Sequence, residues 1–91
     1  MVNMWVVKFT KNAEKDKQFL KRAGLEEKAK KLLILLSTNP FQNPPSYEKL
    51  IGDLIGYYSR RINIQHRLVY KVYKELNCVV VHSIWSHYDD K

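Results

Sequence analysis

A basic, aromatic stretch in the second half of the chain holds the residue types best suited to chemistry on a polyanion. Between residues 57 and 74 there is no acidic side chain. The basic residues of this stretch are Arg60, Arg61, Arg67, Lys71 and Lys74, and its tyrosines are Tyr57, Tyr58, Tyr70 and Tyr73. Arginine binds phosphate through a two-pronged fork and aromatic faces stack on unpaired bases, so the pattern fits single-stranded RNA. It fits equally well a solvated sheet face with buried tyrosines, because tyrosine is a common strand residue.

Two candidate proton carriers flank this stretch. Glu48 follows a proline-rich loop, and His87 follows the last apolar run, beside Tyr88. A carboxylate and an imidazole are the usual agents of general acid–base catalysis near neutral pH. Each taken singly is more often a solvated surface group, and His82, inside an apolar run, is more readily explained as a structural core or edge residue. The residues alone therefore indicate a basic domain with candidate catalytic groups and do not define a reaction.

The elements that must position these residues follow from hydrophobic periodicity. The first half of the chain predicts a strand over residues 4–9 and two helices, the second over residues 25–37. Thr10 can cap the first helix, and Gly24 can end it in the left-handed conformation. Strands are expected in the second half over residues 55–62, where Gly56 can form a bulge, 67–73 and 79–85. The expected fold class is α+β: an N-terminal helix hairpin packed on a mainly antiparallel, twisted sheet in the order βααβββ, as one domain over residues 1–91.

Composition narrows the class of protein. The 91 residues suit one compact domain, and 45% hydrophobic residues argue against disorder. Sixteen Lys and Arg against nine Asp and Glu give a net charge of +7, which favours a nucleic acid or an acidic protein as partner. Cys78 is the only cysteine, so no internal disulfide can form and a reducing, cytoplasmic location is expected. The sequence shows no signal peptide and no apolar run long enough to span a bilayer, so no membrane partner is expected.

Several motifs resemble the signature of the Txe/YoeB toxins of type II toxin–antitoxin systems. The run Gly-Tyr-Tyr-Ser-Arg-Arg-Ile begins at Gly56, and His-Arg-Leu-Val-Tyr begins at His66, at the family's spacing. The run Ser-His-Tyr ends at Tyr88, while Asn-Pro-Phe and Glu-Lys-Leu begin at Asn39 and Glu48. The resemblance covers nearly the whole chain and is weakest in the first predicted helix. The central and terminal motifs together make it specific.

This resemblance implies a RelE-like fold and a metal-independent endoribonuclease, without a cofactor, that cuts mRNA in the ribosomal A site. Glu48 matches the family's proposed general base, Arg67 the arginine that stabilises the transition state, and His87 the proposed general acid. Tyr88 matches the neighbouring tyrosine of the site, and Arg61 matches a phosphate-contacting arginine. Further candidates for contact with RNA or phosphate are Arg60, Lys49 and Lys71. The sequence offers none of the Cys and His clustering of a zinc site.

The resemblance also implies partners. A cognate acidic antitoxin of the YefM type would neutralise the toxin by laying a partly disordered segment on it. The ribosome and its mRNA would be the targets, and the complex with the antitoxin would bind operator DNA. A homodimer is a further expectation.

The sequence departs from the family pattern in two places. Ile51 stands where the family has a site lysine, and Lys49 is the nearest candidate replacement. Asp89, Asp90 and Lys91 extend past the matched tyrosine and add two negative charges near the site. Two alternatives stay open: a same-fold toxin of the ParE kind that inhibits gyrase by protein contact, and an RNA-binding domain without catalysis.

Overall fold

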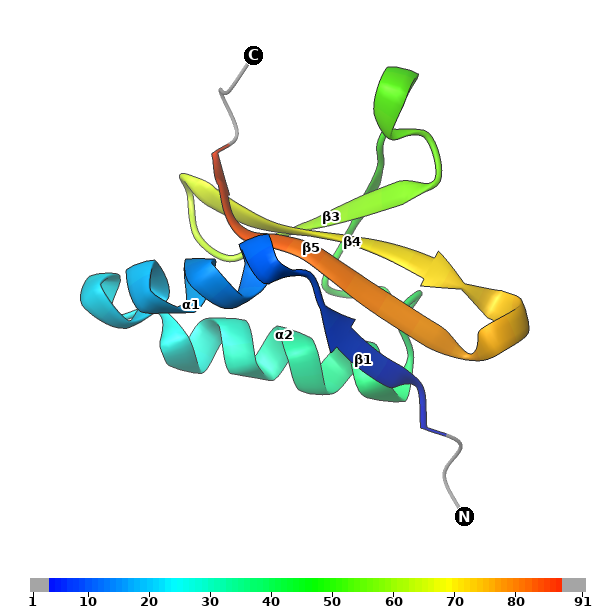
Figure 1. Ribbon diagram of the computed structural model, residues 1–91, viewed down its shortest axis with the longest axis horizontal. Helices are drawn as coiled ribbons and strands as arrows, with labels where there is room; N and C mark the ends of the chain where they lie inside the picture. Colours follow the sequence, from blue (N-terminus) through cyan, green and yellow to red (C-terminus); the bar gives the residue numbers. More distant parts are fainter. Residues whose placement is uncertain (1–3, 88–91) are drawn as a thin grey trace.

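The computed structural model describes residues 4–87, which form two helices on one side of a five-stranded sheet (Figure 1). The helices are α1 (Lys11–Ala23) and α2 (Glu26–Thr38). The strands are β1 (Val6–Phe9), β2 (Glu48–Lys49), β3 (Tyr57–Arg61), β4 (His66–Tyr73) and β5 (Cys78–His87), with short 3₁₀ turns η1 (Gly52–Leu54) and η2 (Lys74–Leu76). The strands lie in the order β1-β5-β4-β3-β2; the β1–β5 pair is parallel and the other described pairs are antiparallel. The predicted α+β class and the predicted order βααβββ are confirmed, and the short strand β2 is added before β3.

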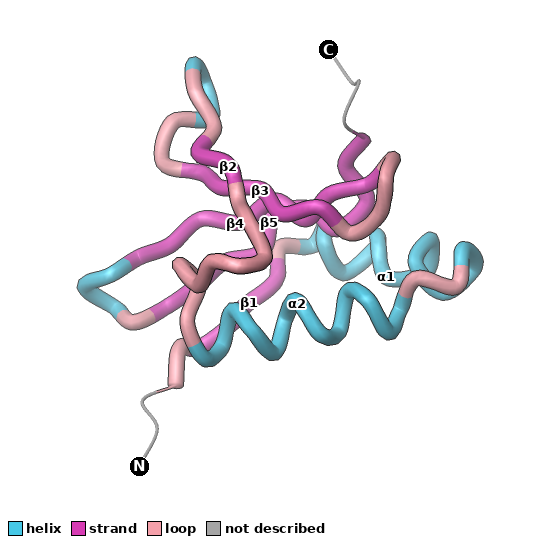
Figure 2. The backbone as a smooth tube through the Cα atoms, turned by 180° about the vertical axis from the view of Figure 1, so that it is seen from behind, coloured by secondary structure: helices cyan, strands magenta, loops and turns pink. Residues whose placement is uncertain are grey.

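The sequence explains both ends of α1. The Oγ1 atom of Thr10 accepts a hydrogen bond from the backbone N–H of Ala13 at 3.1 Å, which satisfies a donor that the helix itself leaves unpaired. Gly24 follows the helix with a φ of 70°, a conformation that costs glycine little. Both predicted caps are confirmed, and the chain then reverses so that α1 and α2 run antiparallel along one face of the sheet (Figure 2). Neither helix within residues 4–87 has the length and apolar character that crossing a membrane requires.

Alternation along β4 separates two faces of the sheet. Leu68 and Tyr70 are fully buried in the core, together with Leu36 of α2 and Val79 of β5. Arg67, Val69 and Lys71 alternate with these two residues in β4 and point to the side away from the helices, because successive side chains of a strand point to opposite faces. We call this side the open face; its residues on β3 and β4 include Tyr57, Ser59, Arg61, Arg67, Val69 and Lys71. The fold therefore buries the helix side of the sheet, whereas the open face carries exposed or half-buried side chains around the buried Ser59 and Val69.

Two expectations about the segment before β3 are wrong. The strand expected over residues 55–62 begins only at Tyr57, because Gly52–Leu54 form η1 and the next two residues form a turn. Gly56 has a φ of 94° and lies in that turn, not in a bulge. The sequence also does not predict β2, because two residues are too few to show an alternating pattern.

Asp16 of α1 holds an irregular pairing between β4 and β5. The register shifts on both sides of Val69, so part of β5 cannot use its backbone N–H groups in the regular ladder. The Oδ2 atom of Asp16 accepts hydrogen bonds from the backbone N–H of Ile84 at 2.9 Å and of Trp85 at 3.3 Å, and from the Ser83 hydroxyl at 3.3 Å. Asp16 is only 8% exposed. This carboxylate thus fixes the path of β5 before the strand ends.

Asp16→Ala should lower the free energy of unfolding by about 2–3 kcal/mol, because the buried N–H of Ile84 loses a charged acceptor. Glu14→Ala is the matched control on the same helix. Glu14 is exposed and lies 2.9 Å from Lys17, and such a surface pair contributes less than about 1 kcal/mol. Urea unfolding followed by circular dichroism measures both variants. Equal stability of the two variants would contradict the anchoring role of Asp16.

Candidate functional site

Glu48 lies on the open face because β2 pairs with β3. It stands opposite Ser59, whose hydroxyl donates a hydrogen bond to Glu48 Oε1 at 3.4 Å. Ser59 is 1% exposed, whereas Glu48 is exposed. The carboxylate is therefore placed by the sheet, held by one long hydrogen bond, and accessible to a substrate.

Two arginines occupy the next positions along the same face. Arg61 of β3 stands directly opposite Arg67 of β4; Arg61 is exposed and Arg67 is half-buried. Arg61 is also a diagonal neighbour of Glu48, and such neighbours in antiparallel strands lie roughly 7–8 Å apart. We call these three residues the carboxylate–arginine patch. Register therefore puts one carboxylate and two guanidinium groups on the same face, and these are groups that can accept a proton and bind a phosphate.

The end of β5 runs beside this patch. Its backbone pairs Ser86 with Arg67 and His87 with His66. The strand end and the β2–β3 hairpin both rise on the side of the sheet away from the helices (Figure 1). The side chain of His87 and all of residues 88–91, which include Tyr88, lie outside the part of the chain that the structure describes. The predicted roles of His87 and Tyr88 therefore stay predictions.

An aromatic stack anchors the end of β5, and sequence analysis missed it. The ring of His66 lies 3.8 Å from the ring of Trp85 at an interplanar angle of 17°, and Trp85 stacks on Phe19 of α1 at 5.9 Å. His66 is only 7% exposed. The stack joins α1, the start of β4 and the end of β5 next to the His66–His87 backbone pair. No spacing rule links residues this far apart in the sequence, so no local signal could have revealed it.

The structure corrects the prediction that Arg60 contacts phosphate. Arg60 is 1% exposed and lies on the helix side of β3. Its guanidinium donates hydrogen bonds to Tyr70 Oη at 3.0 Å and to the backbone carbonyls of Pro45 at 2.7 Å, Pro40 at 2.9 Å and Gln42 at 2.9 Å. A charge buried this deeply needs hydrogen-bond partners, and these bonds use four of the five N–H donors of the guanidinium. Arg60 is therefore a structural residue.

Half of the tyrosines in the basic stretch face the core. Tyr58 stacks on Tyr70 with ring centroids 5.7 Å apart. Burial raises the pKa of the Tyr70 hydroxyl, although the nearby Arg60 acts in the opposite direction. Tyr70 is fully buried and cannot stack on RNA, and the half-buried Tyr58 lies on the helix side of the sheet, away from Glu48. Tyr57 and Tyr73 are the two that lie on the open face, on either side of a lysine.

Of the two lysines predicted to contact RNA, the structure brings only one to the open face. Lys71 lies there, opposite Tyr57 and four residues along β4 from Arg67. Lys49 pairs with Tyr58, so it lies on the opposite side of the sheet from Glu48. Lys49, the candidate replacement for the family's lysine, thus does not share a sheet face with Glu48, and its contact with RNA stays a prediction. Ile51, at the position of the family's lysine, is 85% exposed at the start of η1.

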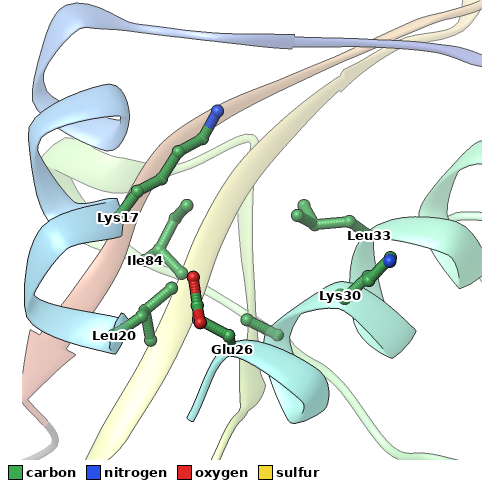
Figure 3. Close-up of a pocket in the computed structure, with 7 residues that line it drawn as sticks. Lys17, Leu20, Glu26, Lys30, Leu33 and Ile84 are labelled. Atoms are coloured by element: carbon green, nitrogen blue, oxygen red, sulfur yellow. The ribbon is translucent and has the colours of Figure 1, made fainter. Parts of the chain in front are cut away.

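A small cavity lies on the other side of the sheet. It measures about 180 Å³ and lies between α1, α2 and β5, with Leu20, Leu33 and Ile84 among its lining residues (Figure 3). Lys17 and Lys30 also line it. None of its lining residues belongs to the predicted site. The chemistry expected from the sequence is therefore separate from this cavity.

Comparison with known proteins identifies the family. Residues 9–88 match the model of the YoeB-like toxin of bacterial type II toxin–antitoxin systems, and the chain belongs to this family. The toxin YoeB of Streptomyces coelicolor is 42% identical over 59 residues, which cover 65% of this chain. The chain spans about 63% of the length of that curated relative. The family resemblance inferred from the motifs is confirmed.

Solved structures share the fold along nearly the whole chain. A YoeB/ParE toxin from Agrobacterium tumefaciens is 33% identical with a TM-score of 0.80, over 91% of this chain and 99% of that chain. A YoeB dimer from Staphylococcus aureus is 33% identical with a TM-score of 0.76, over 92% of this chain and 98% of that chain. A heterotetrameric YoeB–YefM complex from Staphylococcus aureus is 33% identical with a TM-score of 0.75, over 97% and 99%. The two helices and the mostly antiparallel sheet are thus those of the RelE-like toxins.

Arg60→Lys should lower the free energy of unfolding by about 2–3 kcal/mol, because an ammonium cannot satisfy the acceptors arranged around a planar guanidinium. Arg61→Lys is the matched control at the next position, where an exposed conservative change should stay within about 0.5 kcal/mol. Guanidinium chloride unfolding measures both. Two variants of equal stability would restore Arg60 as a candidate for RNA contact.

Proposed function

We propose that this chain is a ribosome-dependent endoribonuclease, the toxin of a type II toxin–antitoxin pair that stops translation by cleaving mRNA in the A site. The observation that carries the proposal is the carboxylate–arginine patch, in which Glu48 is a diagonal neighbour of Arg61 and Arg61 stands opposite Arg67 on the same sheet face. The net charge of +7 suits a large RNA target. Membership of the YoeB-like toxin family supports the same conclusion.

In the proposed reaction the ribose 2′-hydroxyl next to the scissile phosphate is the nucleophile. Glu48 accepts its proton, and the oxygen attacks the phosphorus while Arg61 and Arg67 stabilise the added negative charge. The bond to the 5′-oxygen breaks, and His87, protonated at the start and with Tyr88 beside it, gives its proton to that leaving oxygen. The products are a 2′,3′-cyclic phosphate and a 5′-hydroxyl. The scheme uses side chains alone.

The proposed partners follow from charge and from the relatives. The solved relatives from Staphylococcus aureus include a YoeB dimer and a heterotetrameric YoeB–YefM complex. We propose that this chain binds a cognate acidic antitoxin of the YefM type, that it can form a homodimer, and that the antitoxin complex binds operator DNA in the cytoplasm. An acidic segment laid over Arg61 and Arg67 would exclude RNA from the patch and so neutralise the toxin.

Glu48→Gln should slow cleavage of ribosome-bound mRNA by about 10²–10⁴-fold, because the amide keeps the shape of the side chain but cannot take the proton. Glu75→Gln is the matched control, since Glu75 is an exposed carboxylate in η2 and lies in the β4–β5 turn. Single-turnover cleavage of mRNA in programmed ribosomes measures both. A folded Glu48→Gln protein that cleaves at the wild-type rate would exclude Glu48 as the base.

Cleavage should depend on the ribosome. The proposed site has only one carboxylate and one imidazole as proton carriers, so the ribosome must hold the RNA in the geometry for attack. A misplacement of about 1 Å can lower the rate about 10²-fold. We therefore expect purified protein to cleave mRNA threaded through a ribosome about 10²-fold faster, or more, than the same mRNA in solution. Equal rates on both substrates would reject the A-site mechanism.

A further inference from the structure

A second cluster of side chains lies on the open face, outside the carboxylate–arginine patch. It consists of Tyr57 of β3, Lys71 and Tyr73 of β4, and His82 of β5, and we call it the tyrosine–lysine cluster. The Nζ atom of Lys71 lies 5.3 Å from the ring centroids of both tyrosines. The rings of Tyr57 and His82 meet edge to face with centroids 4.8 Å apart. All four side chains are half-buried, so the cluster forms a shaped surface and not a set of separate solvated groups.

The tyrosine–lysine cluster borders the proposed site of cleavage. Tyr57 precedes Ser59, the cross-strand partner of Glu48, by two residues. Tyr57 and Arg61 are therefore diagonal neighbours of Glu48 on opposite sides, each roughly 7–8 Å away. An RNA strand whose scissile phosphate sits between Glu48 and Arg61 would bring a neighbouring nucleotide over Tyr57.

The chemistry of the cluster suits a nucleobase. Its side chains are one ammonium and three aromatic rings, and burial together with the nearby Lys71 lowers the pKa of His82. A neutral imidazole offers one hydrogen-bond donor and one acceptor, and His82 Nε2 has no hydrogen-bond partner within the part of the chain that the structure describes. A base presents both a π face for stacking and an edge with donors and acceptors, whereas a carboxylate would gain more from a protonated histidine.

We propose that the tyrosine–lysine cluster is a nucleobase subsite that holds the nucleotide next to the scissile phosphate. The base stacks on Tyr57 and its edge faces His82, while the ammonium of Lys71 moves from the tyrosine ring to the RNA backbone. This exchange is favourable because a phosphate offers Lys71 a full negative charge in place of a ring quadrupole. The inference rests on the proposed function, since it assigns a further part of the same RNA to the same face.

The test uses ribosomes programmed with mRNA that carries a 2′-deoxy nucleotide at the scissile position, which can bind but cannot be attacked. Binding is measured with either a normal base or an abasic site immediately 5′ or 3′ of the scissile phosphate. Removal of one of these bases should weaken binding of the wild-type protein about 5- to 150-fold, the range for one stacked base. The same removal should have little further effect on Tyr57→Leu or on His82→Ala, because these variants lack part of the subsite.

Lys74→Gln is the matched control for Lys71→Gln, because it removes the same charge from the same hairpin, where Lys74 lies over the ring of Phe41 at 5.3 Å. Lys74→Gln should keep the wild-type dependence on the base, and Lys71→Gln should reduce it. The proposal is overturned if neither abasic site weakens binding of the wild-type protein. It is also overturned if the loss of binding free energy from the substitution and that from the abasic site are additive.

The proposal is also overturned if Tyr57→Leu, His82→Ala and Lys71→Gln weaken binding of the acidic antitoxin but leave binding of the mRNA unchanged. The cluster would then be a contact for the antitoxin. The proposed function fails separately, by the absence of cleavage of unmodified mRNA by the wild-type protein. In that case the same abasic comparison on free single-stranded RNA still decides whether the cluster binds a base.

Discussion

The hydrogen bonds from the buried guanidinium of Arg60 to the loop after α2 are the constraint on which the candidate site depends. That loop carries no regular structure, yet three of its carbonyls converge on one side chain of β3. Glu48 follows Pro45 by only three residues, so the same bonds set where β2 begins and which side of the sheet its carboxylate faces. A cation in the core of a small domain is costly, and here the cost is offset because the guanidinium donates to three backbone carbonyls and to the Tyr70 hydroxyl.

Much of the fold could be predicted from the sequence, because its signals are local. Thr10 and Gly24 mark the ends of α1, and alternation between Leu68 and Tyr70 defines the two faces of β4. The placement of Glu48 with the arginines followed from motif spacing, which carries the register of β3 and β4 implicitly. The resemblance therefore supplied long-range information that periodicity alone does not contain.

What could not be predicted depended on tertiary contacts. Arg60 and Arg61 are identical side chains at adjacent positions. The first is buried and the second exposed because they point to opposite faces of the sheet, and only the packing of the helices decides which face is covered. The interpretation of His82 as a core or edge residue missed its contact with Tyr57, which lies two strands away across β4. The anchoring of β5 by Asp16 is equally invisible, because 68 residues separate the carboxylate from the Ile84 N–H that it holds.

The division of the sheet into a buried face and an open face has a consequence for how such a domain can change over generations. Along β3, Tyr58 and Arg60 maintain the core, whereas Tyr57 and Arg61 on the other face can meet a partner. Adjacent residues of the strand are therefore under different selection, one set for folding and the other for recognition. A lineage can alter which nucleic acid or antitoxin its toxin recognises by substituting the accessible residues of the open face, such as Tyr57 and Arg61, with little change in the stability of the core.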